Sequence, residues 1–407
     1  MPSLANLLST LPADARLRGR AFERLCAWYL THDPVYAAQV TRVWLWDEWP
    51  GRWGPDAGID LIAETHDGEL WAVQAKCYAP TTRVTKADID SFLSESNRKE
   101  IAFRLLIATT DGIAPNARHV TRGQEKPASL LLLSDLLAST VQWPQALDGP
   151  DPAQRAALTP RPHQTEALRA IATVPLGGRG RVIMACGTGK TLVQLWAHEH
   201  LRSHRTLVLV PSLFLVAQVM REWTANRSRA FEFLAVCSDE SVVGNDDDSF
   251  VADVSEIGVP VTTDPEQIRR FLAGEGDRVV FSTYQSSGRV ADAVAGTATR
   301  FDLALADEAH QLAGTASRDF AAVLDDDRIP AGRRLFFTAT PRYFTGRQTR
   351  EGGDTDLDVA SMDDEARFGT EVHRLSFGEA IRRELLSDYR VVVVIVIRKS
   401  GHIHQEL

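Results

Sequence analysis

A glycine-rich stretch near the middle of the chain has the residue types needed to hold a polyphosphate. Residues 184–191 read Met-Ala-Cys-Gly-Thr-Gly-Lys-Thr and lie between an apolar strand pattern and a helical pattern. In such a loop the backbone N–H groups turn inward, and the next helix points its positive end at the same spot. Lys190 would reach the β- and γ-phosphates, and the Thr191 hydroxyl would bind Mg²⁺. Met184 stands where the strict pattern has its first glycine. The residues expected to contact the nucleotide here are Gly187, Thr188, Gly189, Lys190 and Thr191.

A pair of adjacent acids could complete this site. The apolar residues 303–306 are followed directly by Asp307 and Glu308. The acids therefore come at the C-terminal end of a strand, where parallel sheets bind ligands. Asp307 would bind the Mg²⁺ of the nucleotide, and Glu308 would polarise the water that attacks the γ-phosphate. The two patterns together predict an ATP site.

A second constellation lies in the first hundred residues. Asp60 begins a predicted hairpin over residues 59–75, whose turn contains an Asp-Gly pair. Gln74 and Lys76 are two residues apart and so share one face of the second strand. An aspartate and a second oxygen ligand can hold Mg²⁺, while a lysine orients the attacking water and offsets phosphate charge. In the alternative interpretation Asp60 caps the turn, and Gln74 and Lys76 form the exposed face of an edge strand.

These N-terminal residues resemble the PD-(D/E)xK nucleases, in particular their Mrr-like restriction endonuclease branch, in which glutamine replaces an acid as QxK. Gly58-Ile59-Asp60 and Gln74-Ala75-Lys76 carry the resemblance, which covers most of residues 15–140. Glu23, on a helical pattern over 17–29, matches the acid of the family's first helix. The resemblance implies Mg²⁺-dependent cleavage of DNA with Glu23, Asp60, Gln74 and Lys76 as catalytic residues, Asp60 and Gln74 holding the metal.

The later motifs, in this order, resemble superfamily 2 helicases and translocases of the DEAH type over about residues 158–345. The DEAH-type match is Asp307-Glu308-Ala309-His310, and Thr338-Ala339-Thr340-Pro341 follows another strand. This family tolerates residues other than glycine at the position of Met184. The resemblance implies that Gln164 contacts adenine and that His310, with the Thr338 segment, couples nucleotide state to the grip on DNA. It also implies a set of residues that contact the nucleic-acid backbone: Pro211, Ser212, Ser282, Thr283 and Gln285.

The order of elements defines the expected fold class. Strands alternate with helical patterns after residue 162, which predicts a mostly parallel sheet covered on both faces. We expect an α/β chain: a restriction-endonuclease-like α/β domain, then a RecA-like parallel-sheet P-loop domain, then only the start of a second RecA-like domain. A Pro-, Asp-, Gly- and Ala-rich stretch separates the first two, as is typical of a linker. The expected boundaries are 1–140 for the nuclease domain, 141–160 for the linker, 161–370 for the ATP-binding domain and 371–407 for the truncated second RecA-like domain. The β-branched run 391–397 is expected to be a buried parallel strand.

Composition limits the partners and the compartment. The net charge of −9 argues against a nucleic-acid coat over the whole surface but leaves room for a local basic groove. Four cysteines without a CxxC pair suggest neither a disulfide framework nor a zinc site and fit a reducing cytoplasm. No apolar run reaches the length of a membrane span.

A Mrr-like nuclease ahead of a DEAH motor resembles the N-terminal half of single-polypeptide restriction enzymes related to Type I. The resemblance implies ATP- and Mg²⁺-dependent cutting of foreign double-stranded DNA coupled to translocation. Specificity and methylation would reside in a partner or in a C-terminal region. Two alternatives stay open: a repair or RNA-remodelling helicase whose N-terminal domain binds nucleic acid without cutting it, and an incomplete fragment that only binds ATP and DNA.

Overall fold

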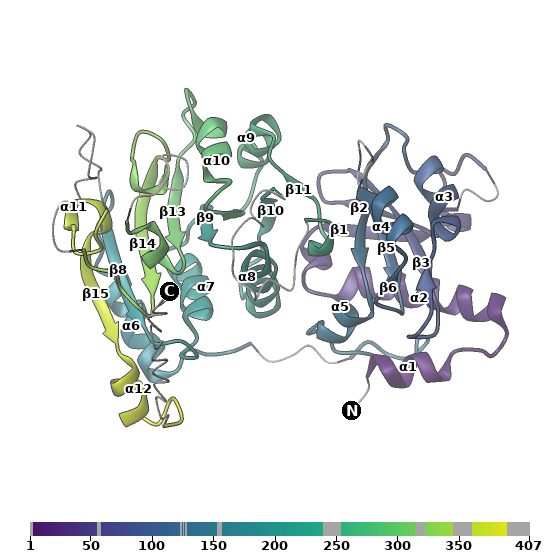
Figure 1. The fold of residues 1–407 in the computed structure, drawn as a ribbon, viewed down its shortest axis with the longest axis horizontal. Coiled ribbons are helices and arrows are strands. Elements are labelled where there is room, and N and C mark those ends of the chain that lie inside the picture. Colours follow the sequence, from purple (N-terminus) through teal and green to yellow (C-terminus); the bar gives the residue numbers. More distant parts are fainter. Residues whose placement is uncertain are drawn as a thin grey trace, which may run out of the picture.

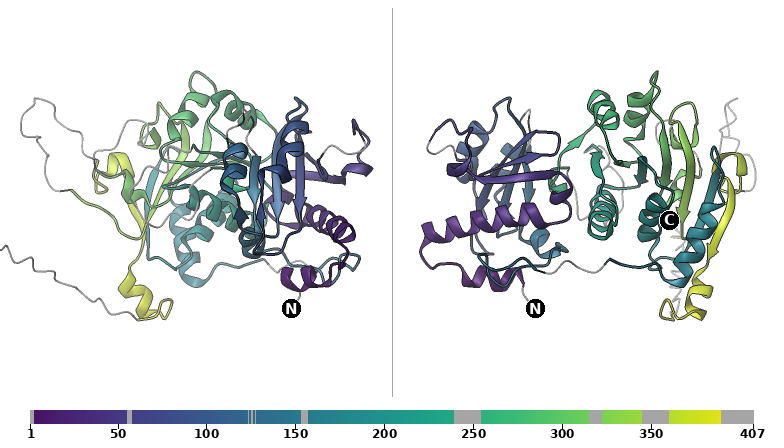
Figure 2. Two further views of the ribbon diagram at one scale, coloured as in Figure 1. Left: turned by 45° about the vertical axis from the view of Figure 1, so that its right-hand side comes forward. Right: turned by 180° about the vertical axis from the view of Figure 1, so that it is seen from behind.

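The computed structural model places two α/β domains side by side along the longest axis of the molecule (Figure 1). The structure describes residues 3–54, 58–122, 124, 126, 128–152, 157–238, 254–314, 322–344 and 360–388. The strand expected at 391–397 lies outside the described residues. Seen from behind, the two domains again lie side by side (Figure 2).

The N-terminal domain is built on a five-stranded mixed sheet with the order β1-β2-β3-β5-β7. β1, β2 and β3 pair antiparallel, and β5 and β7 continue in parallel with β3. One face of the sheet packs against α2, and the opposite face packs against α3 and α4. The strands are β1 (Val40–Leu45), β2 (Leu61–Thr65), β3 (Leu70–Lys76), β5 (Ile101–Ala108) and β7 (Ala128–Leu131). The helices are α1 (Leu4–Thr10), α2 (Ala15–His32), α3 (Lys86–Glu95), α4 (Pro115–Arg122) and α5 (Leu133–Ala138), with 3₁₀ turns η1 (Tyr36–Ala38) and η2 (Trp46–Glu48). A two-stranded sheet joins β4 (Arg83–Val84) to β6 (Gly112–Ile113).

The β2–β3 hairpin forms where the Asp-Gly pair predicts it. Gly68 adopts φ 80°, the left-handed conformation that favours glycine in a tight turn. The Thr65 N–H donates to the Glu69 carbonyl at 2.9 Å and closes the turn. Leu61 pairs with Val73 across the hairpin, so the start of β2 lies next to the end of β3.

The second domain contains an eight-stranded sheet in which every pair is parallel, with the order β11-β10-β12-β9-β13-β14-β8-β15. Helices α6, α7 and α8 cover one face, and α9 and α10 cover the other. The expected α/β class, with a nuclease-like domain followed by a RecA-like parallel sheet, is confirmed. The strands are β8 (Arg179–Met184), β9 (Arg205–Val210), β10 (Glu232–Val236), β11 (Val261–Thr262), β12 (Arg278–Thr283), β13 (Phe301–Ala306), β14 (Ala331–Thr338) and β15 (Thr370–Leu375). The helices are α6 (Pro162–Ala172), α7 (Lys190–His200), α8 (Leu213–Asn226), α9 (Pro265–Ala273), α10 (Ser287–Val294), α11 (Glu365–Phe368) and α12 (Phe377–Arg382), with 3₁₀ turns η4 (Val254–Ile257), η5 (Ala309–Leu312) and η6 (Ala322–Leu324).

The segment after residue 370 joins this sheet and does not begin a separate body within the described residues. β15 pairs in parallel with β8, and the Ala185 N–H donates to the Leu375 carbonyl at 2.9 Å. Arg383, just beyond α12, forms an ion pair with Glu166 of α6 at 2.8 Å. Residues 371–388, expected to begin a second RecA-like domain, thus include a strand of this sheet and an ion pair to α6, and the expected boundary at residue 370 stays a prediction. β15 pairs with the backbone N–H and C=O groups that β8 would otherwise leave unpaired at the sheet edge. The amino-acid sequence of a short polar strand gives no signal for this pairing.

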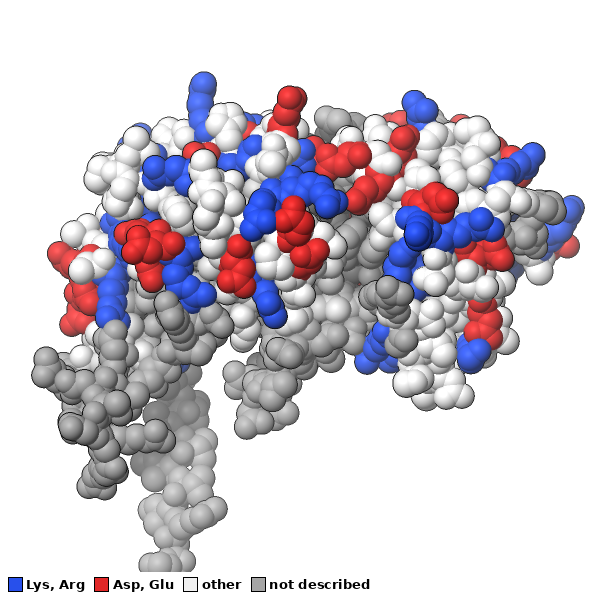
Figure 3. Space-filling model, turned by 90° about the horizontal axis from the view of Figure 1, so that it is seen from above, with Lys and Arg blue, Asp and Glu red and all other residues white. Residues whose placement is uncertain are grey.

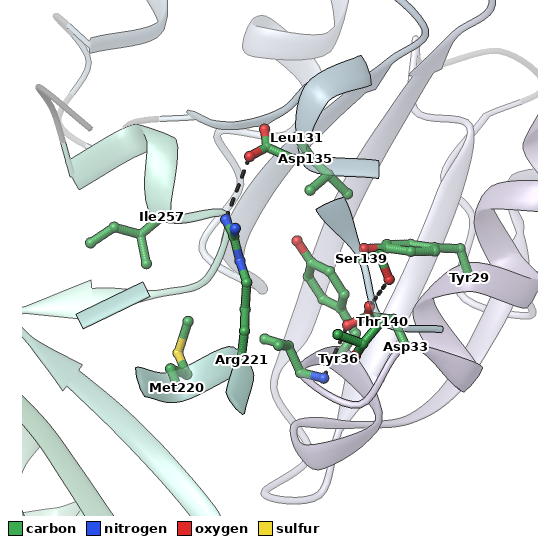
Figure 4. Close-up of a pocket in the computed structure, with 11 residues that line it drawn as sticks. Tyr29, Asp33, Tyr36, Leu131, Asp135, Ser139, Thr140, Met220, Arg221 and Ile257 are labelled. Atoms are coloured by element: carbon green, nitrogen blue, oxygen red, sulfur yellow. Dashed lines mark hydrogen bonds and ion pairs between the residues drawn. The ribbon is translucent and has the colours of Figure 1, made fainter. Parts of the chain in front are cut away.

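The two domains touch through a seam in which hydrogen bonds and an ion pair accompany buried apolar residues of both domains. The Tyr36 hydroxyl donates to the Gly258 carbonyl, and the Gln39 amide donates to the Phe233 carbonyl, both at 2.9 Å. Arg221 of α8 reaches across to Asp135 of α5 at 3.5 Å. Figure 4 shows this arginine beside a small cavity between the domains. α8 of the second domain is therefore also a docking element for the first.

The segment expected to be a linker is packed where it leaves the N-terminal domain. Trp143 is buried and stacks on Tyr29 of α2 with ring centroids 5.5 Å apart. Asp151 accepts a hydrogen bond from the Trp28 indole at 3.1 Å. No helix in the described part of the chain is long and apolar enough to cross a membrane.

Candidate functional site

The phosphate-type loop follows β8 and leads into α7 as the sequence predicts. Gly187 and Gly189 have φ values of 79° and 80°, which glycine adopts without strain. A Cβ atom built on Gly189 would lie 2.4 Å from the side-chain nitrogen of Gln164. The loop is therefore a backbone cradle that glycine keeps open, at the N-terminus of a helix.

Lys190 and the acid pair meet although they are far apart in sequence. The Lys190 Nζ donates to Glu308 Oε1 at 2.8 Å, and the lysine side chain is only 9% exposed. Asp307 follows β13, and its N–H donates to the Leu209 carbonyl of β9 at 2.8 Å. β8 and β13 are separated in the sheet by β14 alone. Because all these strands are parallel, their carboxyl ends bring the lysine and both acids to one edge.

The two acids have opposite electrostatic characters. Burial raises the pKa of Asp307 to about 6, although the Lys190 charge works in the other direction. Burial would also raise the pKa of Glu308, but a hydrogen bond to His310 and the Lys190 charge together lower it to about 2. Glu308 is held at φ 46°, in the left-handed region that is uncommon for a residue with a side chain. Glu308 therefore carries a full negative charge at neutral pH.

His310 and Thr338, which the sequence analysis links, are in contact. The His310 Nδ1 lies 2.9 Å from the Thr338 hydroxyl and 3.4 Å from Glu308 Oε2. The Thr338 hydroxyl also accepts from the Thr340 N–H at 3.1 Å. A short chain of polar contacts thus runs from Glu308 to the end of β14.

Gln164 contacts the loop backbone. Its Nε2 donates to the Thr188 carbonyl at 3.2 Å, and its Oε1 accepts from the Arg161 N–H at 2.8 Å. The His163 Nε2 lies 3.0 Å from the same Thr188 carbonyl. The sequence analysis expects Gln164 to contact adenine, and the structure places it against the loop that would hold the phosphates.

Three residues that sequence reasoning missed support this site. The Trp223 indole of α8 donates to the Thr191 carbonyl at 3.2 Å. Burial raises the pKa of the adjacent Glu222, and a hydrogen bond with the Thr191 side chain partly offsets this. The Tyr284 N–H donates to the Val210 carbonyl at 3.0 Å, and its hydroxyl donates to the Asp307 carbonyl at 2.5 Å. Nothing in the spacing of α8 signals Glu222 or Trp223, because the contacts depend on how α8 packs on α7.

The expected nucleic-acid contacts divide into accessible and buried residues. Pro211 and Ser212 precede α8, and the Ser212 hydroxyl caps it by accepting from the Leu215 N–H at 3.4 Å. Gln285 is exposed. Ser282 and Thr283 are fully buried, with hydroxyls that donate to Thr283 O and Ser286 Oγ. The side chains of Ser282 and Thr283 therefore cannot reach DNA in this structure, because they are the last two residues of β12, a fully buried strand.

The hairpin brings Asp60, Gln74 and Lys76 to one end of the N-terminal sheet. Asp60 Oδ2 accepts from the Ala75 N–H at 2.7 Å. Gln74 is 2% exposed, and its Nε2 donates to the Gly58 carbonyl at 3.1 Å. Its Oε1 is buried without a hydrogen-bond partner among the described residues. Lys76 is half-buried on the same strand face, as its two-residue spacing from Gln74 predicts.

Glu23 reaches the same region from α2 but is already paired. Its Oε2 accepts from Arg20 at 2.9 Å, and Arg20 also forms an ion pair with Asp47 at 2.7 Å. Burial raises the pKa of the Cys26 thiol, and the charges of Asp60 and Glu23 add to that effect. Both acids are therefore close enough to Cys26 to act on its thiol electrostatically.

The residues present fit a divalent cation at each site. No three His, Cys, Asp or Glu side chains cluster as metal ligands anywhere in the described ranges. At the hairpin edge the oxygen donors are Asp60 and the unpartnered amide oxygen of Gln74, and both are of the hard type that Mg²⁺ prefers. At the loop, the Thr191 hydroxyl and Asp307 are the corresponding donors, beside a cradle that a Cβ would fill. Each candidate site thus matches a hard cation bound by few protein ligands.

Comparisons with known proteins agree with both halves of this description. A family model described as "Restriction endonuclease" matches residues 31–151, and one described as "Type III restriction enzyme, res subunit" matches residues 157–343. The structure of an ATP-dependent Type ISP restriction-modification enzyme, LlaBIII, bound to DNA is 30% identical and covers 96% of this chain with a TM-score of 0.78. This chain covers 26% of that enzyme.

Two further relatives match a little over half of this chain. A nuclease-deletion mutant of the Type ISP enzyme LlaGI, in complex with a DNA substrate mimic, is 29% identical over 56% of this chain, with a TM-score of 0.43. A probable helicase, A859L, from African swine fever virus (isolate Tick/Malawi/Lil 20-1/1983) is 30% identical over 59% of this chain and 25% of its own length. The chain spans about a quarter of the length of the relatives it matches. It combines an Mrr-like restriction endonuclease domain with a following superfamily 2 helicase domain of the Type III res kind, and it resembles the Type ISP restriction-modification enzyme LlaBIII.

Proposed function

We propose that this chain supplies two activities to a DNA-restriction system: Mg²⁺-dependent cleavage of double-stranded DNA by the N-terminal domain, and ATP hydrolysis that drives translocation by the second domain. The proposal is carried by the Lys190–Glu308 contact beside Asp307, because a buried lysine and two acids at the carboxyl edge of a parallel sheet suit a nucleotide triphosphate with its metal.

In the motor, each side chain has a defined task. The loop N–H groups and Lys190 bind the phosphates, and Thr191 with Asp307 would hold Mg²⁺, which neutralises charge on the phosphates when bound. The low pKa of Glu308 keeps it ionised, so that it orients and polarises a water molecule. Phosphate binding would draw Lys190 away from Glu308 and release that carboxylate for the water. The contacts of His310 with Glu308 and Thr338 would then pass this change in nucleotide state to the residues that are proposed to grip DNA.

In the nuclease, Asp60 and the Gln74 amide oxygen would hold Mg²⁺, which activates water and offsets charge on the scissile phosphate. Lys76 orients the attacking water and stabilises the developing negative charge. Gln74 is neutral, so this site binds the metal less tightly than a site with two carboxylates. Glu23, paired with Arg20, would orient groups at the edge of the site.

DNA is the proposed partner of both domains. The similar structure of the Type ISP enzyme LlaBIII is a complex with DNA. Because this chain covers only 26% of LlaBIII, we assign methylation and site recognition to a partner or to further sequence. The contacts between the domains would let translocation carry the nuclease along the duplex.

The test uses the purified chain with supercoiled plasmid and Mg²⁺, with and without ATP, and measures nicking, phosphate release and binding of a fluorescent ATP analogue. Lys76→Ala should reduce nicking about 100-fold or more, the lower range for a positioned proton-transfer or charge-stabilising group. Lys190→Ala should weaken ATP binding roughly 10- to 100-fold, the loss of one charged hydrogen bond. Lys99→Ala is the matched control, because Lys99 is exposed in the turn before β5, at the opposite end of the sheet from Lys76.

The outcomes separate the alternatives. Nicking lost in Lys76→Ala, with phosphate release lost in Lys190→Ala, supports both activities. Nicking that also depends on ATP and on Lys190 supports their coupling. Intact DNA together with ATP-dependent strand separation would favour a repair or remodelling helicase whose N-terminal domain only binds. ATP binding without phosphate release or nicking would leave a chain that only binds ATP and DNA.

A further inference from the structure

A buried histidine at the start of α6 holds the nucleotide loop, residues 184–191, by a hydrogen bond. Charged side chains of both signs lie at the surface, as the face seen from above shows (Figure 3), whereas His163 is only 3% exposed. Its Nε2 lies 3.0 Å from the Thr188 carbonyl oxygen. Because a carbonyl oxygen can only accept, Nε2 must carry a proton and donate it. The other ring nitrogen, Nδ1, is buried without a hydrogen-bond partner among the described residues, so the ring is held through the loop alone.

The carbonyl that His163 holds determines how the loop presents one of its N–H groups. The peptide unit between Thr188 and Gly189 is planar, and its carbonyl and N–H point in opposite directions. Both side-chain donors to the Thr188 carbonyl come from α6. The Gly189 N–H of the same peptide therefore points away from α6, where it is available to a phosphate oxygen. A flipped peptide would instead present a carbonyl oxygen, which repels an anion.

Gln164 shares this carbonyl with His163. The Gln164 Nε2 donates to the Thr188 carbonyl at 3.2 Å, and its Oε1 accepts from the Arg161 N–H at 2.8 Å. A bidentate contact with adenine, the contact expected for this residue, would use both ends of the same amide. Gln164 would then loosen its hold on the loop at the moment when the phosphates arrive. His163 has no such competing contact.

We propose that His163 is a positioning residue that keeps the peptide between Thr188 and Gly189 in its phosphate-binding orientation while Gln164 turns to adenine. The proposal rests on the proposed ATP site and adds the residue that keeps base recognition compatible with phosphate binding. In the free protein two donors hold the Thr188 carbonyl. With ATP bound, one donor remains, and His163 acts on the nucleotide only through the loop backbone.

This arrangement predicts different behaviour toward ligands with and without a base. Inorganic tripolyphosphate offers the loop a chain of phosphates but gives Gln164 no base to contact. Both donors then stay on the Thr188 carbonyl, and the loss of either one is covered by the other. ATP removes this redundancy, because adenine draws Gln164 away. The contribution of His163 should therefore be large for ATP and small for tripolyphosphate.

The experiment measures binding of ATP and of inorganic tripolyphosphate to the full chain with Mg²⁺, by displacement of a fluorescent ATP analogue. His163→Phe keeps a ring but removes the donor, and it should weaken ATP binding about 2- to 10-fold, the net value of one hydrogen bond. It should weaken tripolyphosphate binding less than about 2-fold, because Gln164 still holds the carbonyl. His163→Leu, which also lacks a donor but is smaller, should show the same pattern.

Two further variants separate the hydrogen bond from packing. His163→Gln places an amide nitrogen near the position of Nε2 and should restore most of the ATP affinity. His163→Phe combined with Gln164→Ala leaves the carbonyl without either donor, so tripolyphosphate binding should fall about 2- to 10-fold, more than the two single effects combined. His200→Phe is the matched control and should change neither affinity, because His200 is exposed at the C-terminal end of α7.

The failure of this inference is distinct from the failure of the proposed function. If Lys190→Ala weakens ATP binding while His163→Phe binds ATP as tightly as wild type, the role of His163 is wrong and the ATP site stands. Equal losses for both ligands in His163→Phe that His163→Gln does not restore would indicate a general packing defect and would also overturn the inference. If the wild-type chain binds neither ligand, the proposed ATP site fails, and the role of His163 fails with it.

Discussion

Gln74 offers a sharp test of the candidate metal site, because replacing it with glutamate changes charge and almost nothing else. Gln74 is 2% exposed, donates to the Gly58 carbonyl at 3.1 Å and keeps its Oε1 without a hydrogen-bond partner among the described residues, while the N–H of the next residue, Ala75, donates to Asp60. Gln74→Glu removes the donor, points a carboxylate at a carbonyl oxygen and adds a second negative charge next to Asp60. Burial and a like charge both favour the protonated form, so the pKa of the new carboxyl rises well above that of an exposed glutamate.

The size of the effect follows from that pKa. A glutamate that ionises at about pH 4.3 when unfolded and must be protonated in the folded state costs up to about 4 kcal/mol at about pH 7.5, and about 1 kcal/mol at about pH 5. Because the folded-state pKa is the higher one, the penalty is absent below about pH 4.3 and grows as pH rises. Mg²⁺ should offset much of this penalty, since binding at about 100 times the dissociation constant stabilises the folded state by about 2.7 kcal/mol.

The assay is urea unfolding followed by tryptophan fluorescence, which reports mainly on the N-terminal domain because most of the tryptophans lie there. Gln74→Glu should be clearly less stable than wild type at neutral pH without metal, and should regain stability with Mg²⁺ or at acidic pH. Gln74→Met, which has no ionisable group, should show neither response. A glutamate variant as stable as wild type at neutral pH, and indifferent to Mg²⁺, would refute the placement of the metal at this pair.

Three further perturbations probe the motor and the seam. Gly189→Ala should weaken ATP binding and lower the stability of the folded state by about 1–3 kcal/mol, because its Cβ would meet Gln164 at 2.4 Å at a positive φ. Gly177→Ala is the control for the conformational cost alone, because it has φ +79° and open space around the Cβ. Equal losses of stability in both variants would show that the contact with Gln164 is unimportant. His198 is fully buried, and burial lowers its pKa to about 4. Because the folded-state pKa is depressed, wild-type stability should fall by about 2 kcal/mol between about pH 7.5 and pH 5 relative to His198→Phe, and parallel urea titrations of the two proteins would contradict this. A double-mutant cycle of Arg221→Ala and Asp135→Ala in urea unfolding should give a coupling free energy of about 0.2–1 kcal/mol, as for other partly exposed ion pairs. A larger value would show that water is more completely excluded from the contact between the domains.

The fold was predictable where periodicity and turn chemistry act locally. The β2–β3 hairpin forms at its Asp-Gly pair, and the alternation of strands and helices after residue 162 does give a parallel sheet. The meeting of Lys190 with Glu308 was also predictable, because parallel topology alone sends both to the same edge. Residues that depend on a local pattern or on a general rule of topology are therefore readable from sequence.

Other features depend on tertiary partners that a single sequence does not name. β15 has the burial pattern of a half-exposed strand, and only its pairing with β8 reveals the sheet to which it belongs. Ser282 and Thr283 look like hydroxyls at a strand end, yet the covering helices bury them completely. Glu222 and Trp223 contact the nucleotide loop through the packing of α8 on α7. In each case the deciding energy is the burial of a group against a segment that is distant in sequence.

Tyr284 gives the molecule a mechanical property. Its N–H donates to the end of β9 and its hydroxyl to the carbonyl of Asp307, while the Asp307 N–H returns to β9. β9 lies between β12 and β13, so the ends of three strands are clipped together within hydrogen-bond distance. Pro211 and Ser212 leave β9 directly beyond this clip. If a nucleic-acid strand bound at Pro211 and Ser212 and displaced them, these hydrogen bonds would pass the displacement directly to the backbone of Asp307 in the candidate nucleotide site.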